Sequence, residues 1–315
     1  MMSSNDITVA EEVVADNNFC ASCGIAEVDD VKLKPCDSCD LVKYCGDECQ
    51  QLHRSEHEIL CKERAAEIRD EILFRQPESS HLGDCPICFL PFPVDGDKYV
   101  MHDCCMKIVC NGCAIANLTC RGLDQIKGTT CPFCRVPIKS KEEREMDMLK
   151  LKRVEANDPM ALRNMGKIYY YQKRDYEGAH KYFSKAAELG NAEAHHFLSV
   201  MYHFGRGVEK DKEKGLYHLE EAAIKGDPDA RYVLGYEESG KGRVERAVKH
   251  WIIAANLGDR ESIQELKVCY ADGKISKEDF AGALRAYQTA VDAAKSPQRE
   301  VGDALRKRME DERHS

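Results

Sequence analysis

Residues 20–61 read CASCGIAEVDDVKLKPCDSCDLVKYCGDECQQLHRSEHEILC, a stretch in which cysteine and histidine recur in closely spaced pairs. A Cys-x-x-Cys turn presents two thiolates to one tetrahedral metal ion, and ligands four positions apart do the same from one face of a helix. Eight ligands therefore predict two complete zinc sites. The pairs are Cys20 with Cys23, Cys36 with Cys39, Cys45 with Cys49, and His57 with Cys61.

Residues 47–62 lack Gly and Pro and place Cys49, His53, His57 and Cys61 at successive i, i+4 positions, so all four could share one face of a helix. Because two tetrahedral sites need only eight ligands, we interpret His53 as a solvated imidazole or as the partner of a ligand. A direct ligand role for His53 is the alternative.

The spacing, together with Tyr44-Cys45 and Cys49-Gln50, resembles that of a MYND finger across the whole of this first zinc module (residues 18–61). The resemblance implies a protein-interaction module with interleaved sites. Arg54 stands where the family usually has Trp, three residues before the histidine ligand. The implied ligand sets are Cys20, Cys23, Cys45 and Cys49 for one zinc, and Cys36, Cys39, His57 and Cys61 for the other.

A second run of pairs begins with CPIC at 85–88 and ends with CPFC at 131–134. This second zinc module (residues 81–138) resembles a RING finger, again with two interleaved zinc ions. Adjacent Cys104 and Cys105 require a distorted backbone to share one metal, so His102 is an alternative ligand there. The implied sets are Cys85, Cys88, Cys110 and Cys113, and Cys104, Cys105, Cys131 and Cys134.

RING fingers commonly act as ubiquitin-protein ligases that position the thioester of a conjugating enzyme and supply no nucleophile. The resemblance therefore implies no catalytic side chain in this chain. It assigns Ile87, Pro132 and Arg135 as candidate contacts to a ubiquitin-conjugating enzyme. Residues 114–118 read AIANL and lack the large aromatic side chain often found on this helix. A zinc-stabilised fold without a catalytic partner is the alternative.

From residue 156 to residue 294 the sequence repeats at offsets of 33, 36 and 32 residues, aligned on Ala161, Ala194, Ala230 and Ser262. The partner segments end in Gly190, Gly226 and Gly258, as expected just past a helix C-terminus. These units predict a solenoid of four helix-turn-helix repeats. Residues 198–226 resemble a Sel-one-like repeat, a relative of the tetratricopeptide class that binds proteins.

The sequence thus predicts two small zinc-stabilised α+β modules followed by an all-α solenoid. The expected parts are a disordered acidic segment at 1–17, the first zinc module at 18–61, a helical connector at 62–80, the second zinc module at 81–138, a charged helical connector at 139–155, the repeats at 156–294 and a polar tail at 295–315.

The formal charge of −9 is concentrated at the N-terminus, because residues 1–61 carry 4 basic and 13 acidic groups. Bound thiolates add negative charge, whereas nucleic-acid binding requires a basic surface. We therefore expect protein partners, no membrane partner and about four structural zinc ions. No signal peptide is recognisable, and thiolate ligands favour a reducing compartment, cytoplasm or nucleus. The leading hypothesis is an adaptor with ubiquitin-ligase activity, and the alternatives are a non-catalytic scaffold and, less favoured, a chromatin or nucleic-acid reader.

Overall fold

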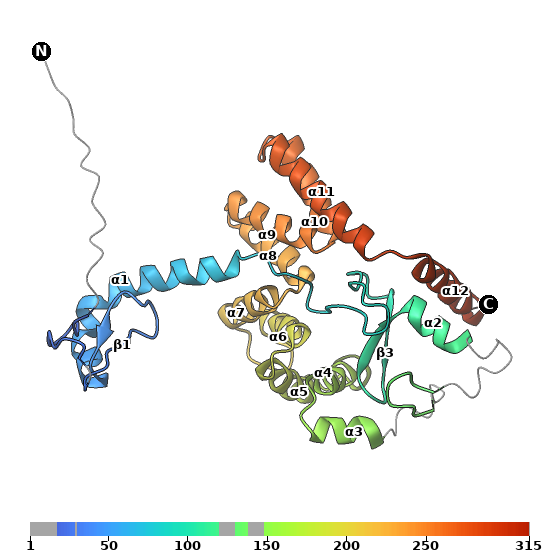
Figure 1. Ribbon diagram of the computed structural model, residues 1–315, viewed down its shortest axis with the longest axis horizontal. Coiled ribbons are helices and arrows are strands. Elements are labelled where there is room, and N and C mark those ends of the chain that lie inside the picture. Colours follow the sequence, from blue (N-terminus) through green and yellow to red (C-terminus); the bar gives the residue numbers. More distant parts are fainter. Residues whose placement is uncertain (1–17, 29, 120–129, 138–147, 315) are drawn as a thin grey trace, which may run out of the picture. The chain divides into compact units, whose positions relative to one another are not determined.

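The computed structural model describes residues 18–28, 30–119, 130–137 and 148–314 (Figure 1). It divides into two compact units, residues 1–73 and 74–315. The acidic segment predicted at 1–17 and most of the connector predicted at 139–155 lie outside the described residues. Among the helices that are described, none combines the length and the apolar character needed to span a bilayer.

The first unit joins a two-stranded sheet to one long helix. Strand β1 (Lys34–Pro35) pairs antiparallel with β2 (Lys43–Tyr44), and α1 (Asp47–Leu73) follows. No Gly or Pro occurs between residues 47 and 73, so the helix continues through the boundary predicted at residue 61. The first zinc module and its predicted connector therefore share one helix. The buried core is small and consists mainly of ligands: Cys20, Leu33, Cys36, Cys39 and Tyr44.

The second zinc module contains a two-stranded sheet and a short helix. Strand β3 (Tyr99–His102) pairs antiparallel with β4 (Lys107–Cys110), and Tyr99 lies opposite Cys110. Helix α2 (Asn111–Thr119) begins directly after β4. Among the described residues, the buried core cluster of this module consists of Phe92, Val109 and three cysteines. Such a core is too small to fold on apolar burial alone, which explains the density of metal ligands.

Helices arranged in antiparallel pairs make up the rest of the second unit, and the prediction of an all-α repeat domain is confirmed. The pairs α4–α5, α6–α7, α8–α9 and α10–α11 pack against each other and then against the next pair. The helices are α3 (Met148–Glu155), α4 (Pro159–Lys167), α5 (Tyr176–Glu188), α6 (Ala192–Phe204), α7 (Lys212–Ile224), α8 (Pro228–Gly240), α9 (Val244–Asn256), α10 (Arg260–Ala271) and α11 (Lys277–Ala293), with a π-helical segment at Ile168–Lys173 after α4.

The turns between repeats have the predicted chemistry. Gly190, Gly226 and Gly258 adopt φ of +87°, +85° and +95°, the left-handed region that glycine enters without strain. The next residue caps the following helix in each case: Asn191 accepts from the backbone N–H of Ala194, and Asp227 and Asp259 act in the same way. Helix boundaries in the repeats are therefore fixed by local sequence.

Residues 295–315, expected to be a polar tail, contain the 18-residue helix α12 (Pro297–His314). This helix packs against α2 of the second zinc module, as Figure 1 shows for the red and green helices. In sequence, α2 ends at Thr119 and α12 begins at Pro297, and the repeats lie between them. The second zinc module and the repeat domain therefore form one compact unit.

Candidate metal centres

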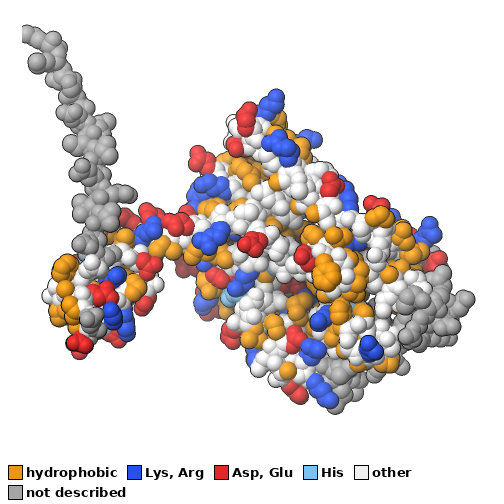
Figure 2. Space-filling model, in the orientation of Figure 1, with side chains coloured by type: hydrophobic (Ala, Val, Ile, Leu, Met, Phe, Trp, Pro, Cys, Tyr) orange, Lys and Arg blue, Asp and Glu red, His pale blue; other side chains and the backbone are white. Residues whose placement is uncertain are grey.

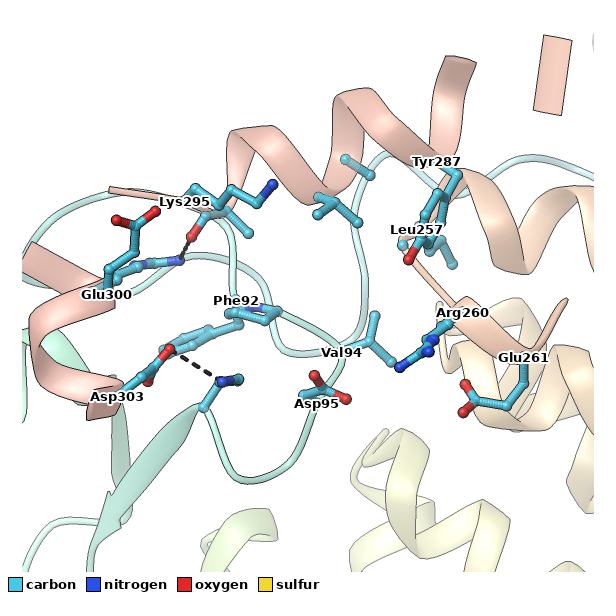
Figure 3. A pocket seen from close by; sticks show the side chains of 17 residues that line it. Phe92, Val94, Asp95, Leu257, Arg260, Glu261, Tyr287, Lys295, Glu300 and Asp303 are labelled. Atoms are coloured by element: carbon cyan, nitrogen blue, oxygen red, sulfur yellow. Dashed lines mark hydrogen bonds and ion pairs between the residues drawn. The ribbon is translucent and has the colours of Figure 1, made fainter. Parts of the chain in front are cut away.

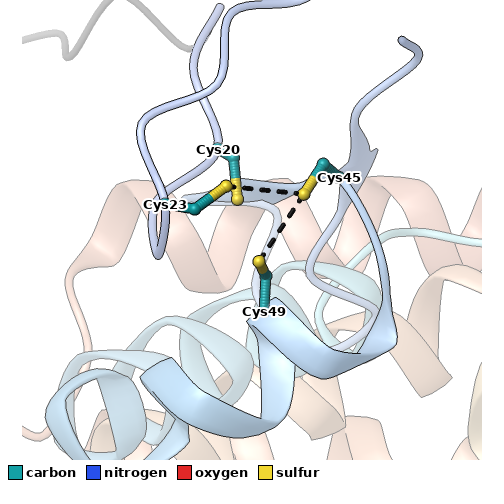
Figure 4. Close-up of side chains that lie close together, drawn as sticks. All are labelled: Cys20, Cys23, Cys45 and Cys49. Carbon is teal, nitrogen blue, oxygen red and sulfur yellow. Dashed lines mark hydrogen bonds between the residues drawn. The ribbon is translucent and has the colours of Figure 1, made fainter.

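The structure brings the sixteen predicted ligands together in four groups. Within each group, the donor atoms lie within 4.8 Å of one another. Figure 4 shows the first group, in which side chains from two loops and from the start of α1 converge. The groups are Cys20, Cys23, Cys45 and Cys49; Cys36, Cys39, His57 and Cys61; Cys85, Cys88, Cys110 and Cys113; and Cys104, Cys105, Cys131 and Cys134.

The spacing of the sulfur atoms fits a tetrahedral zinc ion. Zinc–thiolate bonds of about 2.3 Å place two sulfur atoms about 3.8 Å apart on a tetrahedron edge. The Sγ–Sγ distance is 3.8 Å between Cys36 and Cys61 and 3.6 Å between Cys105 and Cys131. These distances are far longer than the ~2.05 Å of a disulfide, and the cysteines of all four groups are free. The donor sets therefore fit about four zinc ions.

Each Cys-x-x-Cys turn that starts or closes a site uses the same backbone device. The residue after the second cysteine has φ near +60°, and its N–H donates to the carbonyl of the first cysteine. In the turn at Cys85 this donor is Phe89, at an N–O distance of 2.8 Å, and in the turn at Cys131 it is Arg135, at 3.0 Å. Gly24 and Asp40 occupy the corresponding positions in the first module. Three of these residues are not glycine, and they adopt a conformation that non-glycine residues rarely adopt.

His53 supports the first module without joining a ligand group. Its Nδ1 lies 3.0 Å from the Tyr44 hydroxyl oxygen, and its ring stacks on that of His57 with centroids 5.7 Å apart. The His57 Nε2 lies 3.0 Å from Cys39 Sγ. Burial lowers the pKa of His57, which favours the neutral imidazole that binds zinc. Of the two roles considered for His53, this geometry corresponds to the partner of a ligand.

The adjacent cysteines of the second module both reach the same group. Cys104 Sγ lies 3.3 Å from Cys134 Sγ, while Cys105 Sγ lies near Cys131. The backbone distortion that this requires occurs at Met106, where φ is +56° and the N–H donates to the His102 carbonyl. His102 is not a member of the group, and its ring lies edge-on to Phe133.

The three candidate contacts to a conjugating enzyme lie on the surface of the zinc turns. Ile87 is 39% exposed, and Pro132 and Arg135 are also exposed. Phe89, which sequence reasoning did not single out, is 76% exposed in the same zinc turn as Ile87. Its place directly after Cys88 could have indicated this exposure, because the residue that follows the Cys-x-x-Cys pair adopts the left-handed backbone conformation. On α2, Asn117 donates to the Thr130 carbonyl, which ties the helix to the second zinc turn.

All four groups supply four protein ligands, which leaves no coordination position for substrate or water. The centres are therefore structural, and they hold the loops that carry the exposed side chains.

Comparison with known families follows the same division of the chain. The MYND finger model matches residues 20–61, and the Sel1 repeat model matches residues 159–191, 192–227 and 228–259. The chain is thus a zinc-binding protein that combines a MYND finger with three Sel1 repeats, which are protein-interaction modules. The fourth helix pair, α10–α11, follows the matched repeats and packs in the same way.

Several curated proteins resemble parts of the chain. The mouse DAP3-binding cell death enhancer 1 is 26% identical over 166 residues, which is 40% of this chain and 32% of that protein. The E3 ubiquitin-protein ligase DA2 of Arabidopsis thaliana is 36% identical over 86 residues, which is 24% of this chain and 20% of that protein. The chain therefore spans a third or less of the length of these relatives.

Among solved structures, a Sel1 repeat protein from Oxalobacter formigenes shares 28% identity, with a TM-score of 0.41. The match covers 49% of this chain and 66% of that one. The protective antigen c5321 of uropathogenic Escherichia coli, which displays an SLR fold, shares 27% identity with a TM-score of 0.39, over 46% of this chain and 33% of that one.

Proposed function

We propose that this protein is an adaptor with RING-type ubiquitin-protein ligase activity. In this proposal the second zinc module recruits a ubiquitin-conjugating enzyme, while the MYND finger and the Sel1 repeats hold the protein to be modified. The cytoplasm or the nucleus, where thiolates stay reduced, is the proposed location. The observation that supports the proposal best is the exposure of Ile87, Phe89, Pro132 and Arg135 on zinc-held turns.

Each of these side chains has a use in such a complex. Exposed apolar groups beside the first zinc turn offer buried area to a partner, which is the usual source of binding energy at interface centres. The Arg135 guanidinium presents several N–H donors that can bind ubiquitin and the conjugating enzyme together. The partial likeness to the ligase DA2 supports the same reaction class.

Surface charge agrees with protein partners. On the face seen in Figure 2, basic and acidic side chains are interspersed over the second unit and do not form a broad basic surface. A nucleic-acid reader would require a basic surface of this kind.

The test is a reconstituted ubiquitin transfer assay with a broad panel of conjugating enzymes. We expect ubiquitin chains with the wild-type protein and a loss of about tenfold or more, equivalent to about 1.4 kcal/mol, for Ile87→Ala and for Arg135→Ala. Ile72→Ala is the matched control, because Ile72 is 39% exposed like Ile87 but lies on α1 beyond the MYND finger and outside the second zinc module. Absence of transfer with every enzyme of the panel would contradict the proposal.

The second candidate is a scaffold without catalytic partners. It is favoured by α2, on which the small polar Asn117 bonds to Thr130 and no large aromatic side chain is available for docking. A scaffold would retain its bound proteins after Ile87→Ala and Arg135→Ala, and these proteins would be unchanged in their ubiquitin content.

A further inference from the structure

Helix α12 approaches α2 so closely that only glycine fits at the contact. A Cβ on Gly112 would lie 2.7 Å from the Gln298 carbonyl oxygen, and a Cβ on Gly302 would lie 2.5 Å from the Gly112 Cα. Real Cβ atoms essentially never come this close to another atom. The two helix backbones can therefore approach each other only because both positions are glycine. The C-terminal helix is thus fitted to the second zinc module at backbone level.

Polar contacts surround this glycine pair. Asn111 is 2% exposed, donates to Asp303 Oδ1 at 2.8 Å and accepts from Arg306 Nη1 at 2.9 Å. Asp303 also pairs with Lys98 at 3.3 Å, at one side of a cavity of about 500 Å³ that lies beside α11 and α12 (Figure 3). The contact between α2 and α12 therefore combines close backbone packing with specific hydrogen bonds.

Arg299, in the first turn of α12, extends this contact to a zinc ligand. Its side chain is 4% exposed, and Nη1 donates to the carbonyl oxygens of Pro91 at 2.6 Å and Ala294 at 2.8 Å. Its Nη2 donates to the Leu90 carbonyl at 2.9 Å and lies 3.3 Å from Cys88 Sγ. A buried guanidinium is costly unless its donors are satisfied. The two Nη atoms reach three carbonyl oxygens and the Cys88 sulfur, whereas Nε has no hydrogen-bond partner among the described residues.

We infer that α12 is part of the second zinc module and that Arg299 is a positioning residue for the zinc site of Cys85, Cys88, Cys110 and Cys113. A four-thiolate zinc site carries a formal charge of about −2, which a buried cation offsets. The N–H···S bond also fixes the direction of the Cys88 thiolate. Hydrogen-bond partners of metal ligands typically change metal affinity 10- to 100-fold when they are removed.

This arrangement leaves the candidate docking side chains uncovered. Arg299 reaches Cys88 and the carbonyls behind it, whereas Ile87 and Phe89 remain 39% and 76% exposed. The inference concerns metal retention and does not depend on ligase activity, so either proposal can fail without the other.

The experiment uses the full-length zinc-loaded protein, challenged with a chelator and sampled with a thiol-alkylating reagent. Mass spectrometry then gives the labelling rate of each cysteine. For Arg299→Ala we expect the four cysteines of this site to label about tenfold faster or more. Cys88 should lead Cys85, because only Cys88 loses its hydrogen bond. Arg299→Lys, which keeps the charge but not the planar set of donors, should fall between wild type and Arg299→Ala.

Two comparisons make the result decisive. Arg308→Ala is the matched control, because Arg308 is exposed on the same helix. Gly302→Ala should accelerate labelling of the same four cysteines by displacing α12, and it serves if Arg299→Ala does not fold. The inference is overturned if Arg299→Ala and Gly302→Ala label like Arg308→Ala. It is also overturned if cysteines of the first zinc module accelerate equally, since that would indicate general unfolding.

Discussion

His218, on α7, is half-buried in the repeat domain among other ring side chains. Its Nδ1 lies 3.0 Å from that of His195, and its ring stacks on Tyr202 with centroids 5.6 Å apart. Burial, with smaller contributions from His195 and His180, lowers the pKa of His218 to about 4, although Glu221 opposes the shift. Between the ordinary value of 6.5 and about 4, the unfolded chain binds a proton that the folded chain does not. The contribution of His218 to stability is therefore complete above pH 6.5 and is lost as the pH falls toward 4.

We predict that His218→Phe, which keeps the ring stacking, makes unfolding less sensitive to acid. The free energy of unfolding, measured in urea for both proteins at each pH, should shift in favour of the variant as the pH falls from 7 to 5. Taking the difference between the two proteins cancels the acid sensitivity of the zinc ligands. Parallel pH profiles for wild type and variant would contradict the assignment.

At the same scale, the zinc ligands were predictable and the conformation beside them was not. Pair spacing gives every ligand outside the Cys104–Cys105 pair, because ligands close in sequence bind one ion. It does not give the left-handed backbone of Phe89 and Arg135, since propensity disfavours that conformation and only the assembled turn requires it. The choice between Cys104 and His102 also depends on three-dimensional geometry.

Among the elements, α8 and α9 illustrate how the small residues of the repeats permit close helix contact. A Cβ on Gly235 of α8 would lie 2.2 Å from Nε1 of Trp251 on α9. Trp251 is 3% exposed and donates to the Tyr232 carbonyl, so its ring cannot move without losing that bond. Gly235→Ala should therefore destabilise the repeat domain.

We expect Gly235→Ala to reduce the free energy of unfolding by about 1 to 3 kcal/mol, the usual cost of overpacking a core. Gly240→Ala on the same helix is the matched control, because a Cβ built there would meet no described atom within 4 Å apart from those of its chain neighbours and its own helix backbone. Urea denaturation followed by circular dichroism measures both. Equal stability of the two variants would show that the ring of Trp251 is free to adjust.

Local signals also determine how much of the element order was predictable. Gly190 and Asn191 end one helix and begin the next through contacts within a few residues, so the repeat boundaries follow from sequence. The docking of α12 rests on contacts such as Arg299 with Cys88, which are 211 residues apart. Nothing near Arg299 in the sequence indicates a zinc ligand as its partner, and its charged surroundings predicted a polar tail.

Across the whole molecule, the repeats are stabilised by apolar packing and the two zinc modules by metal binding. The repeats bury apolar clusters around Phe183 and Trp251, while the two zinc modules bury mostly their own ligands. Because the modules have so little apolar core, their folding depends on metal, with about 10 to 16 kcal/mol available per structural site. Each zinc-held turn then presents its exposed side chains in one conformation, as binding a partner requires.

The metal content of the purified full-length protein tests this account most directly. Native mass spectrometry, with the zinc concentration measured independently by atomic emission, gives the number of ions per chain. Four groups of four ligands predict about four zinc ions per chain. Two or fewer would contradict the assignment of two zinc modules with two structural sites each.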